Sequence, residues 1–80
     1  NPSKDGKIFL RLTSPSNGKA EIMILTISGD IKAKYEKEVL KGINDIPLSL
    51  NLPDGFYIAR VKVPDGKCGF AKFVIARKWK

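Results

Sequence analysis

The chain has 80 residues, a net charge of +7 and a hydrophobic fraction of 42%, so residues 1–80 are expected to form a single globular domain. No apolar run approaches the roughly 20 residues that span a bilayer, so no transmembrane segment is expected, and the first residues lack the apolar core of a signal peptide. The single cysteine excludes an internal disulfide, and the absence of histidine removes the commonest general base and metal ligand.

The first part of the chain predicts strands, because apolar residues recur at every second position. Residues 7–13 alternate in the manner of a half-buried strand. After a loop of turn-forming residues, residues 20–27 carry apolar side chains on both faces, which is typical of a strand at the centre of a sheet or covered on both sides. The expected inward-facing residues are Ile8, Leu10 and Leu12 in the first strand and Ala20, Ile22 and Ile24 in the second.

A short SGD turn at residues 28–30 separates this strand from a third alternating segment, IKAKYEKE. Two strands that flank a short glycine-containing turn predict a β-hairpin, here with Ile31, Ala33 and Tyr35 facing inward. The alternative is a helix through residues 33–42, whose residue types have good helix propensity. We prefer the hairpin, because the apolar residues of this segment do not form a helical stripe.

Two Pro-Asp-Gly triplets punctuate the second half of the chain. Residues 46–50 alternate, and Pro47 lacks a ladder donor, which predicts an edge strand. The triplets at residues 53–55 and 64–66 fit turns in which proline fixes φ and glycine takes a positive φ. One more strand is expected between the triplets and another after the second. The expected inward residues are Tyr57, Ala59, Val61 and Val63 in the former and Ala71, Phe73 and Ile75 in the latter. The chain therefore predicts an all-β fold, an Ig-like antiparallel β-sandwich of about seven short strands.

Tyr57 follows the first triplet directly, at the start of a late strand. In sandwich folds a tyrosine at such a place returns its hydroxyl to the backbone across the bend, as in the tyrosine corner. We therefore predict that Tyr57 pins this corner, in preference to a role in binding.

The polar residues do not assemble a catalytic pattern. All five aspartates fall in or beside predicted turns, where aspartate accepts backbone hydrogen bonds, namely Asp5, Asp30, Asp45, Asp54 and Asp65. A catalytic carboxylate pair or a weak calcium site built from these turn residues is less favoured. With no histidine to activate it, Cys68 is expected to be a small, partly buried strand residue rather than a reactive thiol. The chain is therefore expected not to be an enzyme and to need no cofactor and no metal.

The basic residues admit two interpretations. Interleaved with aromatic residues, they could form a cationic surface for a polyanion such as lipopolysaccharide or single-stranded nucleic acid. Lysine at alternate strand positions is, however, what a solvated sheet face carries, and we prefer that interpretation, so no nucleic-acid partner is expected. The residues concerned are Arg60, Lys62, Lys67, Lys72, Arg77, Lys78 and Lys80, with Phe70 and Trp79 nearby.

An ordered set of short motifs runs over essentially the whole chain. It comprises the initial NP, Gly6, AEIMILTISGD, Gly42 and Asn44 ahead of IPLSL, LPDGFYIARV, and the closing KFVIAR with basic residues at the end. In this order and spacing the chain resembles the type A C-terminal sorting domain of the type IX secretion system of Bacteroidetes. It departs from that family at Thr26, where aspartate is usual, at Cys68, and in the basic character of its tail.

The resemblance implies a seven-stranded Ig-like sandwich at the C-terminus of a larger exported protein. In that family the domain is a non-catalytic sorting signal. The outer-membrane translocon recognises it after the precursor reaches the periplasm, and a sortase-like cysteine peptidase commonly removes it, which leaves the upstream cargo domain at the cell surface or secreted. By motif match, recognition by the translocon and the sortase would fall on Lys72, Phe73, Val74, Ile75, Arg77 and Lys78. The structural motif positions would be Gly29, Pro53, Gly55, Tyr57 and Val61.

A second class of function fits the same residues, an accessory Ig-like carbohydrate- or polyanion-binding module of a secreted hydrolase. Exposed aromatic residues such as Phe56 or Trp79 would then stack on sugar, or the basic face would hold a polyanion.

Overall fold

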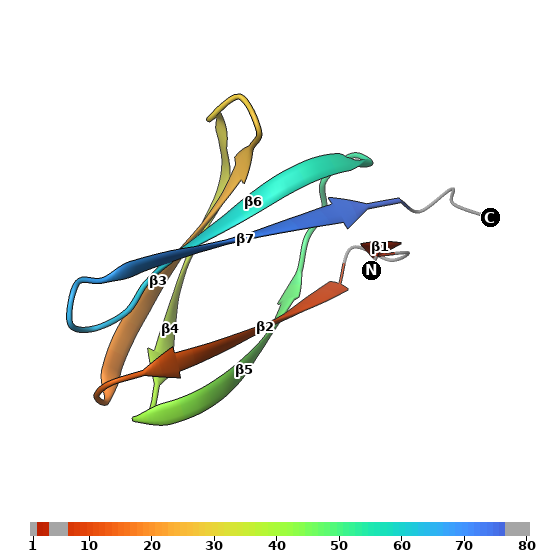
Figure 1. The fold of residues 1–80 in the computed structure, drawn as a ribbon. Helices are drawn as coiled ribbons and strands as arrows, with labels where there is room; N and C mark the ends of the chain where they lie inside the picture. Colours follow the sequence, from red (N-terminus) through yellow and green to blue (C-terminus); the bar gives the residue numbers. More distant parts are fainter. Residues whose placement is uncertain (1, 4–6, 77–80) are drawn as a thin grey trace.

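A computed structural model describes residues 2–3 and 7–76 and shows two layers of β-strands (Figure 1). This confirms the all-β sandwich expected from the sequence, with six strands of eight or nine residues and one of two residues, and the described residues contain no helix. The strands are β1 (Pro2–Ser3), β2 (Lys7–Ser14), β3 (Gly18–Thr26), β4 (Ile31–Val39), β5 (Gly42–Ser49), β6 (Gly55–Lys62) and β7 (Cys68–Ile75). No helix long and apolar enough to cross a membrane occurs within the described ranges.

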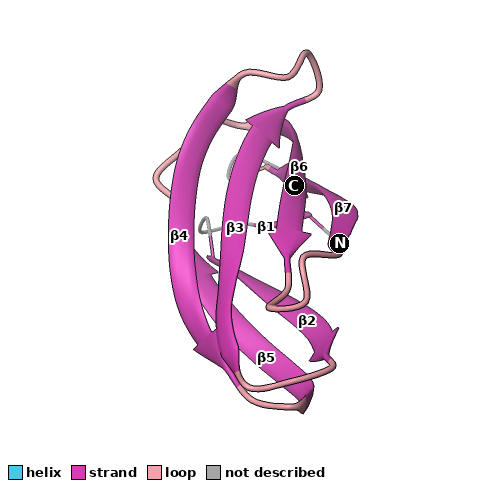
Figure 2. Cartoon of the chain, turned by 90° about the vertical axis from the view of Figure 1, so that its left-hand side faces the viewer, coloured by secondary structure: helices cyan, strands magenta, loops and turns pink. Residues whose placement is uncertain are grey.

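The strands form a large sheet and a small sheet. The large sheet has the order β1-β7-β6-β3-β4, and the small sheet consists of β2 and β5. Figure 2 shows β4, β3, β6 and β7 side by side in the large sheet. All neighbouring strands are antiparallel except β1 and β7, which run parallel, with Pro2 opposite Val74 and Ser3 opposite Ile75.

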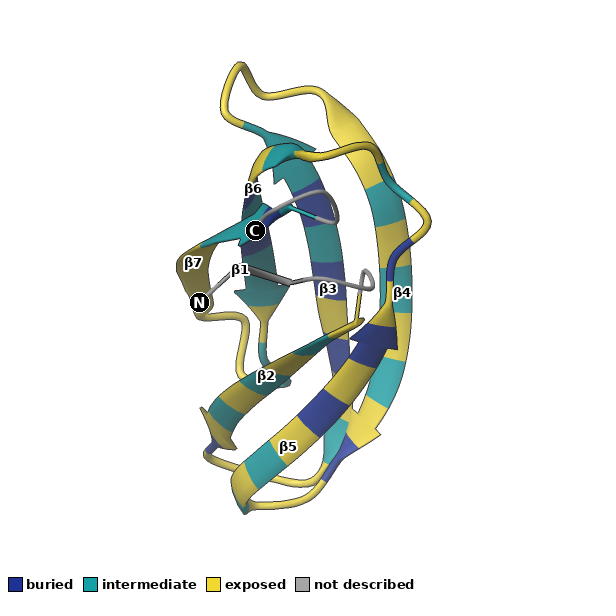
Figure 3. Ribbon diagram, turned by 90° about the vertical axis from the view of Figure 1, so that its right-hand side faces the viewer, coloured by how far each residue is buried: buried dark blue, intermediate teal, exposed yellow. Residues whose placement is uncertain are grey.

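The core lies between the two sheets, where the inward residues of β3, β5 and β6 meet. The bands of burial that alternate along β3 and β5 in Figure 3 follow the period of two expected for strands with one face covered. The inward residues expected for β2, β3 and β5 all belong to the core or pack against it. In the large sheet β3 lies between β4 and β6, which agrees with the central strand predicted for this segment. The buried hydrophobic residues are Ala20, Ile22, Ile24, Val39, Ile46, Leu48, Leu50, Tyr57, Ala59 and Ile75.

The hairpin of β3 and β4 confirms the predicted strand and shows that the helix alternative was wrong. One residue of β4 departs from the expected face. Ile24 lies opposite Ala33, but its neighbour Leu25 lies opposite Ile31, so the register shifts by one residue at this point. Because successive side chains along a strand point to opposite sides, such a bulge moves the residues on one side of it to the opposite face of the sheet. Ile31 therefore points outward and is 51% exposed, whereas Ala33 and Tyr35 pack against the core as predicted.

The two Pro-Asp-Gly triplets make different connections. Residues 64–66 close the hairpin of β6 and β7, where the Gly66 amide donates to the Val63 carbonyl at 2.8 Å. Residues 53–55 instead carry the chain from β5 in the small sheet to β6 in the large sheet. The first triplet is thus a corner between layers, and only the second reverses a strand within one sheet.

Gly18 opens β3 at a close approach between two connections. Its φ is +154°, and a Cβ at this position would lie 3.0 Å from Cγ of Pro64. We predict that Gly18→Val lowers the free energy of unfolding by about 1–3 kcal/mol, because the added side chain must displace a rigid ring. Urea denaturation measures this change. Gly69→Val is the matched control, since a Cβ at Gly69 meets nothing within 4 Å, and equal losses in the two variants would contradict the prediction.

Candidate functional site

The recognition residues expected on the last strand divide between its two faces. Lys72 and Val74 lie on the outer face of β7, whereas Phe73 and Ile75 alternate with them on the inner face. Ile75 is only 1% exposed and belongs to the core, so a partner of the folded domain cannot touch it. The structure therefore brings Lys72 and Val74 together as the accessible part of this set. Arg77 and Lys78 lie outside the described residues.

An apolar area surrounds Lys72 and Val74 on the outer face of the large sheet. Phe56 lies directly opposite Val74 and is 68% exposed, and Ile58 lies opposite Lys72. Leu25 of β3 lies opposite Ile58 in turn, so Lys72, Ile58 and Leu25 form a row across three strands. A shallow hollow of about 320 Å³ lies against Phe56, Lys72, Phe73 and Val74. This face combines a cationic side chain with an exposed aromatic ring.

Tyr57 pins the corner between the sheets, as predicted. Its hydroxyl donates a hydrogen bond to the Pro53 carbonyl at 2.6 Å, and its ring is buried. The ring stacks on Phe73 with 5.7 Å between centroids, which joins the corner to the last strand. A Cβ at Gly55 would lie 3.8 Å from the Tyr57 ring, an ordinary contact distance. Pro53 and Tyr57 thus have structural roles in one corner, Gly55 begins β6 beside them, and Val61 packs against the core further along β6.

Gly29 lies in the turn between β3 and β4, where its φ of +98° is one that glycine adopts readily. Its amide donates to the Thr26 carbonyl at 2.9 Å. The Thr26 hydroxyl oxygen accepts a hydrogen bond from the Asp30 amide at 3.0 Å. A hydroxyl can serve here as a side-chain acceptor for the turn in the same way as a carboxylate. Thr26 therefore supplies the side-chain acceptor of this turn.

The Asn44 side chain closes the turn between β4 and β5, which gives Gly42 and Asn44 of the motif set a structural role. Its side-chain carbonyl accepts from the Leu40 amide at 2.9 Å, and its Nδ2 donates to the carbonyls of Leu40 and Gly42 at 2.8 and 3.1 Å. Asn17 Oδ1 accepts from the neighbouring Lys41 amide at 2.7 Å and ties the loop after β2 to this turn. The motif residues described here close bends of the sandwich.

Asp45 was wrongly expected in or beside a turn. It lies within β5 directly opposite Arg11 of β2, on the outer face of the small sheet. Arg11 Nε donates to Asp45 Oδ1 at 2.8 Å, and this hydrogen bond lowers the pKa of the Asp45 carboxyl from its ordinary value. Asp30 and Asp65 do lie in turns, where Asp65 Oδ1 accepts from the Lys67 amide at 3.0 Å. Asp5 lies outside the described residues.

The Arg11–Asp45 pair gives a pH-dependent prediction. Because the pKa of Asp45 is lowered on folding, the contribution of the pair to stability is present above the unfolded pKa and is lost as the pH falls through the folded one. Arg11→Ala should raise the pKa of Asp45 towards its ordinary value, which an NMR titration of the side-chain carboxyl measures. Arg60→Ala is the control and should leave that titration unchanged. A pKa of Asp45 that is the same with and without Arg11 would contradict the assignment.

Cys68 was expected to be partly buried, but it is exposed at the start of β7. It lies opposite Lys62, and directly paired residues share a face, so its side chain is on the outer face of the sheet. The Sγ atom lies 3.6 Å from Arg60 Nη2. The same register places Gly69 on the inner face, opposite Val61.

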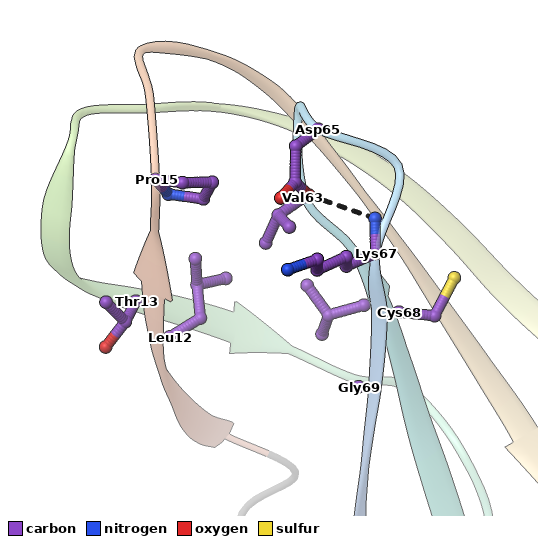
Figure 4. A pocket seen from close by; sticks show the side chains of 9 residues that line it. Leu12, Thr13, Pro15, Val63, Asp65, Lys67, Cys68 and Gly69 are labelled. Atoms are coloured by element: carbon purple, nitrogen blue, oxygen red, sulfur yellow. Dashed lines mark hydrogen bonds between the residues drawn. The ribbon is translucent and has the colours of Figure 1, made fainter.

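Sequence reasoning missed a hollow that lies on this inner side of β7. Leu12 and Pro15 come from β2 and the loop after it, and Val61 and Val63 come from β6 and the hairpin beyond it. Together with Gly69 they line a groove of about 440 Å³ (Figure 4). The isolated Gly69 inside a strand pattern was the signal that could have indicated a close approach of another chain.

Among residues 2–3 and 7–76, no group of three or more cysteine, aspartate or glutamate side chains could hold a metal ion. Comparison of the chain with protein-family models, with curated proteins and with solved structures finds no match in any of the three.

Proposed function

We propose that the chain is a non-catalytic sorting domain of the type IX secretion class, which directs an attached cargo to the cell surface or the medium through the periplasm and outer membrane. Its partners would be the outer-membrane translocon and a sortase-like cysteine peptidase. The upstream cargo domain would carry whatever activity the precursor has.

The observation that carries this proposal is the ordered motif set. Its geometry agrees with a domain that is read as a folded surface. Thr26, Asn44 and Tyr57 each use a side chain to fix a bend, and the sandwich that they hold displays Lys72 and Val74 on the outer face of β7. A partner can recognise such a rigid surface without reorganising it, which lowers the cost of binding.

A reporter fusion tests the proposal. A signal peptide and a fluorescent or enzymatic cargo are placed ahead of residues 1–80 in a Bacteroidetes host that has this secretion system. The cargo is expected in the surface or medium fraction, and truncation after Ala76 should leave it in the periplasm. This truncation is preferable to one that starts at Lys72, because it keeps the buried Ile75 in place.

Point variants separate recognition from folding. Lys72→Glu should reduce surface delivery, whereas Lys34→Glu makes the same charge change at an exposed position of β4 and should not. Both variants are checked for folding by circular dichroism. Normal delivery of the truncated and Lys72→Glu fusions, or delivery of the cargo in a host without the translocon, would overturn the proposal.

The hollow beside Phe56 favours a second candidate function, in which the chain is an accessory module that binds carbohydrate or a polyanion. The exposed ring could stack on a sugar while Lys72 holds an anionic group. Retention of the purified chain on a heparin column or glycan array, lost in Phe56→Ala, would support it. Retention that Phe56→Ala leaves unchanged, or no retention at all, would remove this candidate.

A further inference from the structure

The groove of about 440 Å³ lies at the seam between the two sheets, on the side of β2 and β7. Figure 4 shows Leu12 and Pro15 on one side of it, Val63 on the other, and the Lys67 side chain extending over the space between them. Lys67 has no carboxylate within ion-pair distance among the described residues. The groove is therefore apolar inside and carries a cationic group at its mouth.

Gly69 lines one wall of the groove without a side chain, and neither its backbone conformation nor its packing requires glycine there. It lies within β7 opposite Val61, and its φ is not positive, so the backbone does not require glycine there. A Cβ at Gly69 would meet nothing within 4 Å, so packing does not require glycine either. Glycine inside a strand is otherwise a cost, and it often marks a place where a ligand or another backbone approaches closely.

The edge of β7 beside the groove is unpaired. The two residues of β1 cover β7 only at Val74 and Ile75, and no other described strand pairs with the edge formed by residues 68–73. Ala71 lies on the inner face opposite the buried Ala59, as predicted, yet it is exposed. A row of free amide and carbonyl groups at a strand edge is a template for an extended chain, which can pair with it as an added strand.

We propose that this groove binds an extended segment of a different protein, which adds as a strand to the free edge of β7. The segment carries apolar side chains at alternate positions, and these enter the groove over Leu12 and Val61. Its intervening side chains are acidic, because they face outward beside Lys72, and the negative charge that they give the segment also complements Lys67 at the mouth of the groove. A second copy of the chain is a poor occupant, since it brings another net charge of +7.

This inference concerns the free edge and the inner face of β7 and goes beyond the proposed sorting role, with which it shares Lys72 among the accessible recognition residues. Peptide binding is measured on the purified chain, whereas sorting is measured as the location of a cargo. Either result can fail without the other.

A peptide of about eight residues in which valine and glutamate alternate, close to the usual strand length, tests the proposal. Titrated into the isotopically labelled chain, it should shift the amide NMR signals of residues 68–73 and give contacts between backbone protons across the new strand pair. Gly69→Val should weaken the binding by about tenfold or more, because the new side chain fills the groove. The fold tolerates this change, so the thermal unfolding temperature should not fall.

Three controls make the result specific. Ser49→Val adds the same kind of side chain on an exposed strand of the small sheet and should leave binding unchanged. The same peptide N-methylated on the residues that face β7 should lose binding, and a valine and lysine peptide should bind more weakly. Binding that survives both Gly69→Val and N-methylation, or no binding at about millimolar peptide, overturns the proposal. Self-association of the chain through the same edge would overturn it in favour of a second copy.

Discussion

Replacing Ile24 by alanine is expected to lower the free energy of unfolding by about 2–5 kcal/mol. Ile24 is completely buried in β3, the strand between β4 and β6 in the large sheet. Removing its side chain exposes its core neighbours to a cavity, and a chain of 80 residues buries too little surface to compensate. The unfolding temperature should fall by about 8 °C or more, which calorimetry or circular dichroism measures.

Ile27→Ala is the matched control, since Ile27 is 69% exposed just beyond the same strand. Its effect should stay within about 0.5 kcal/mol. Leu10→Ala should fall between the two, because Leu10 is only half-buried against the core. Equal effects of Ile24→Ala and Ile27→Ala would mean that the strand faces are assigned wrongly.

Substitution of Tyr57 is expected to have the second large effect on the free energy of unfolding, and the contributions of the ring and the hydroxyl can be measured separately. Tyr57→Ala should cost about 3–5 kcal/mol, because it removes a buried ring that stacks on Phe73. Tyr57→Phe keeps the ring and loses only the hydrogen bond to the Pro53 carbonyl, which should cost about 0.5–1.5 kcal/mol. Urea denaturation of both variants gives the two contributions.

Tyr35→Phe is the control for the hydroxyl. Tyr35 packs against the core from β4, and its hydroxyl makes no hydrogen bond to any described residue. Its removal should change the free energy of unfolding by no more than about 0.5 kcal/mol. If Tyr57→Phe were as neutral as Tyr35→Phe, the corner would be held by the ring alone and the hydroxyl would have no role in it.

Strand faces and bends were predictable from the sequence because each depends on neighbouring residues. Alternation placed Ile22, Ile24 and Leu48 in the core, since side chains along a strand point to opposite faces. The hydrogen bond of Tyr57 was predictable as well, because it spans only four residues. The glycine at position 29 marked a turn that needs a positive φ.

Features that depend on distant pairing were not predictable. The bulge that turns Ile31 outward arises where β4 meets β3, and nothing in its own alternation reveals the shift. Asp45 looks like a turn residue until β2 places Arg11 opposite it, 34 residues away in the chain. The groove likewise needs β2 and β6 to be brought together. Its signal in the sequence, Gly69, has meaning only once the unpaired edge of β7 is known.

The parallel contact of β1 with β7 has a consequence for any fusion. It places Pro2 beside Val74, so β1 and the end of β7 lie at the same pole of the sandwich (Figure 1). The opening between Pro15 and Lys67 lies at the opposite pole, separated by most of the length of β7, about 20 Å. A fusion made beside Pro2 or just after β7 therefore joins the domain about one strand length from that opening.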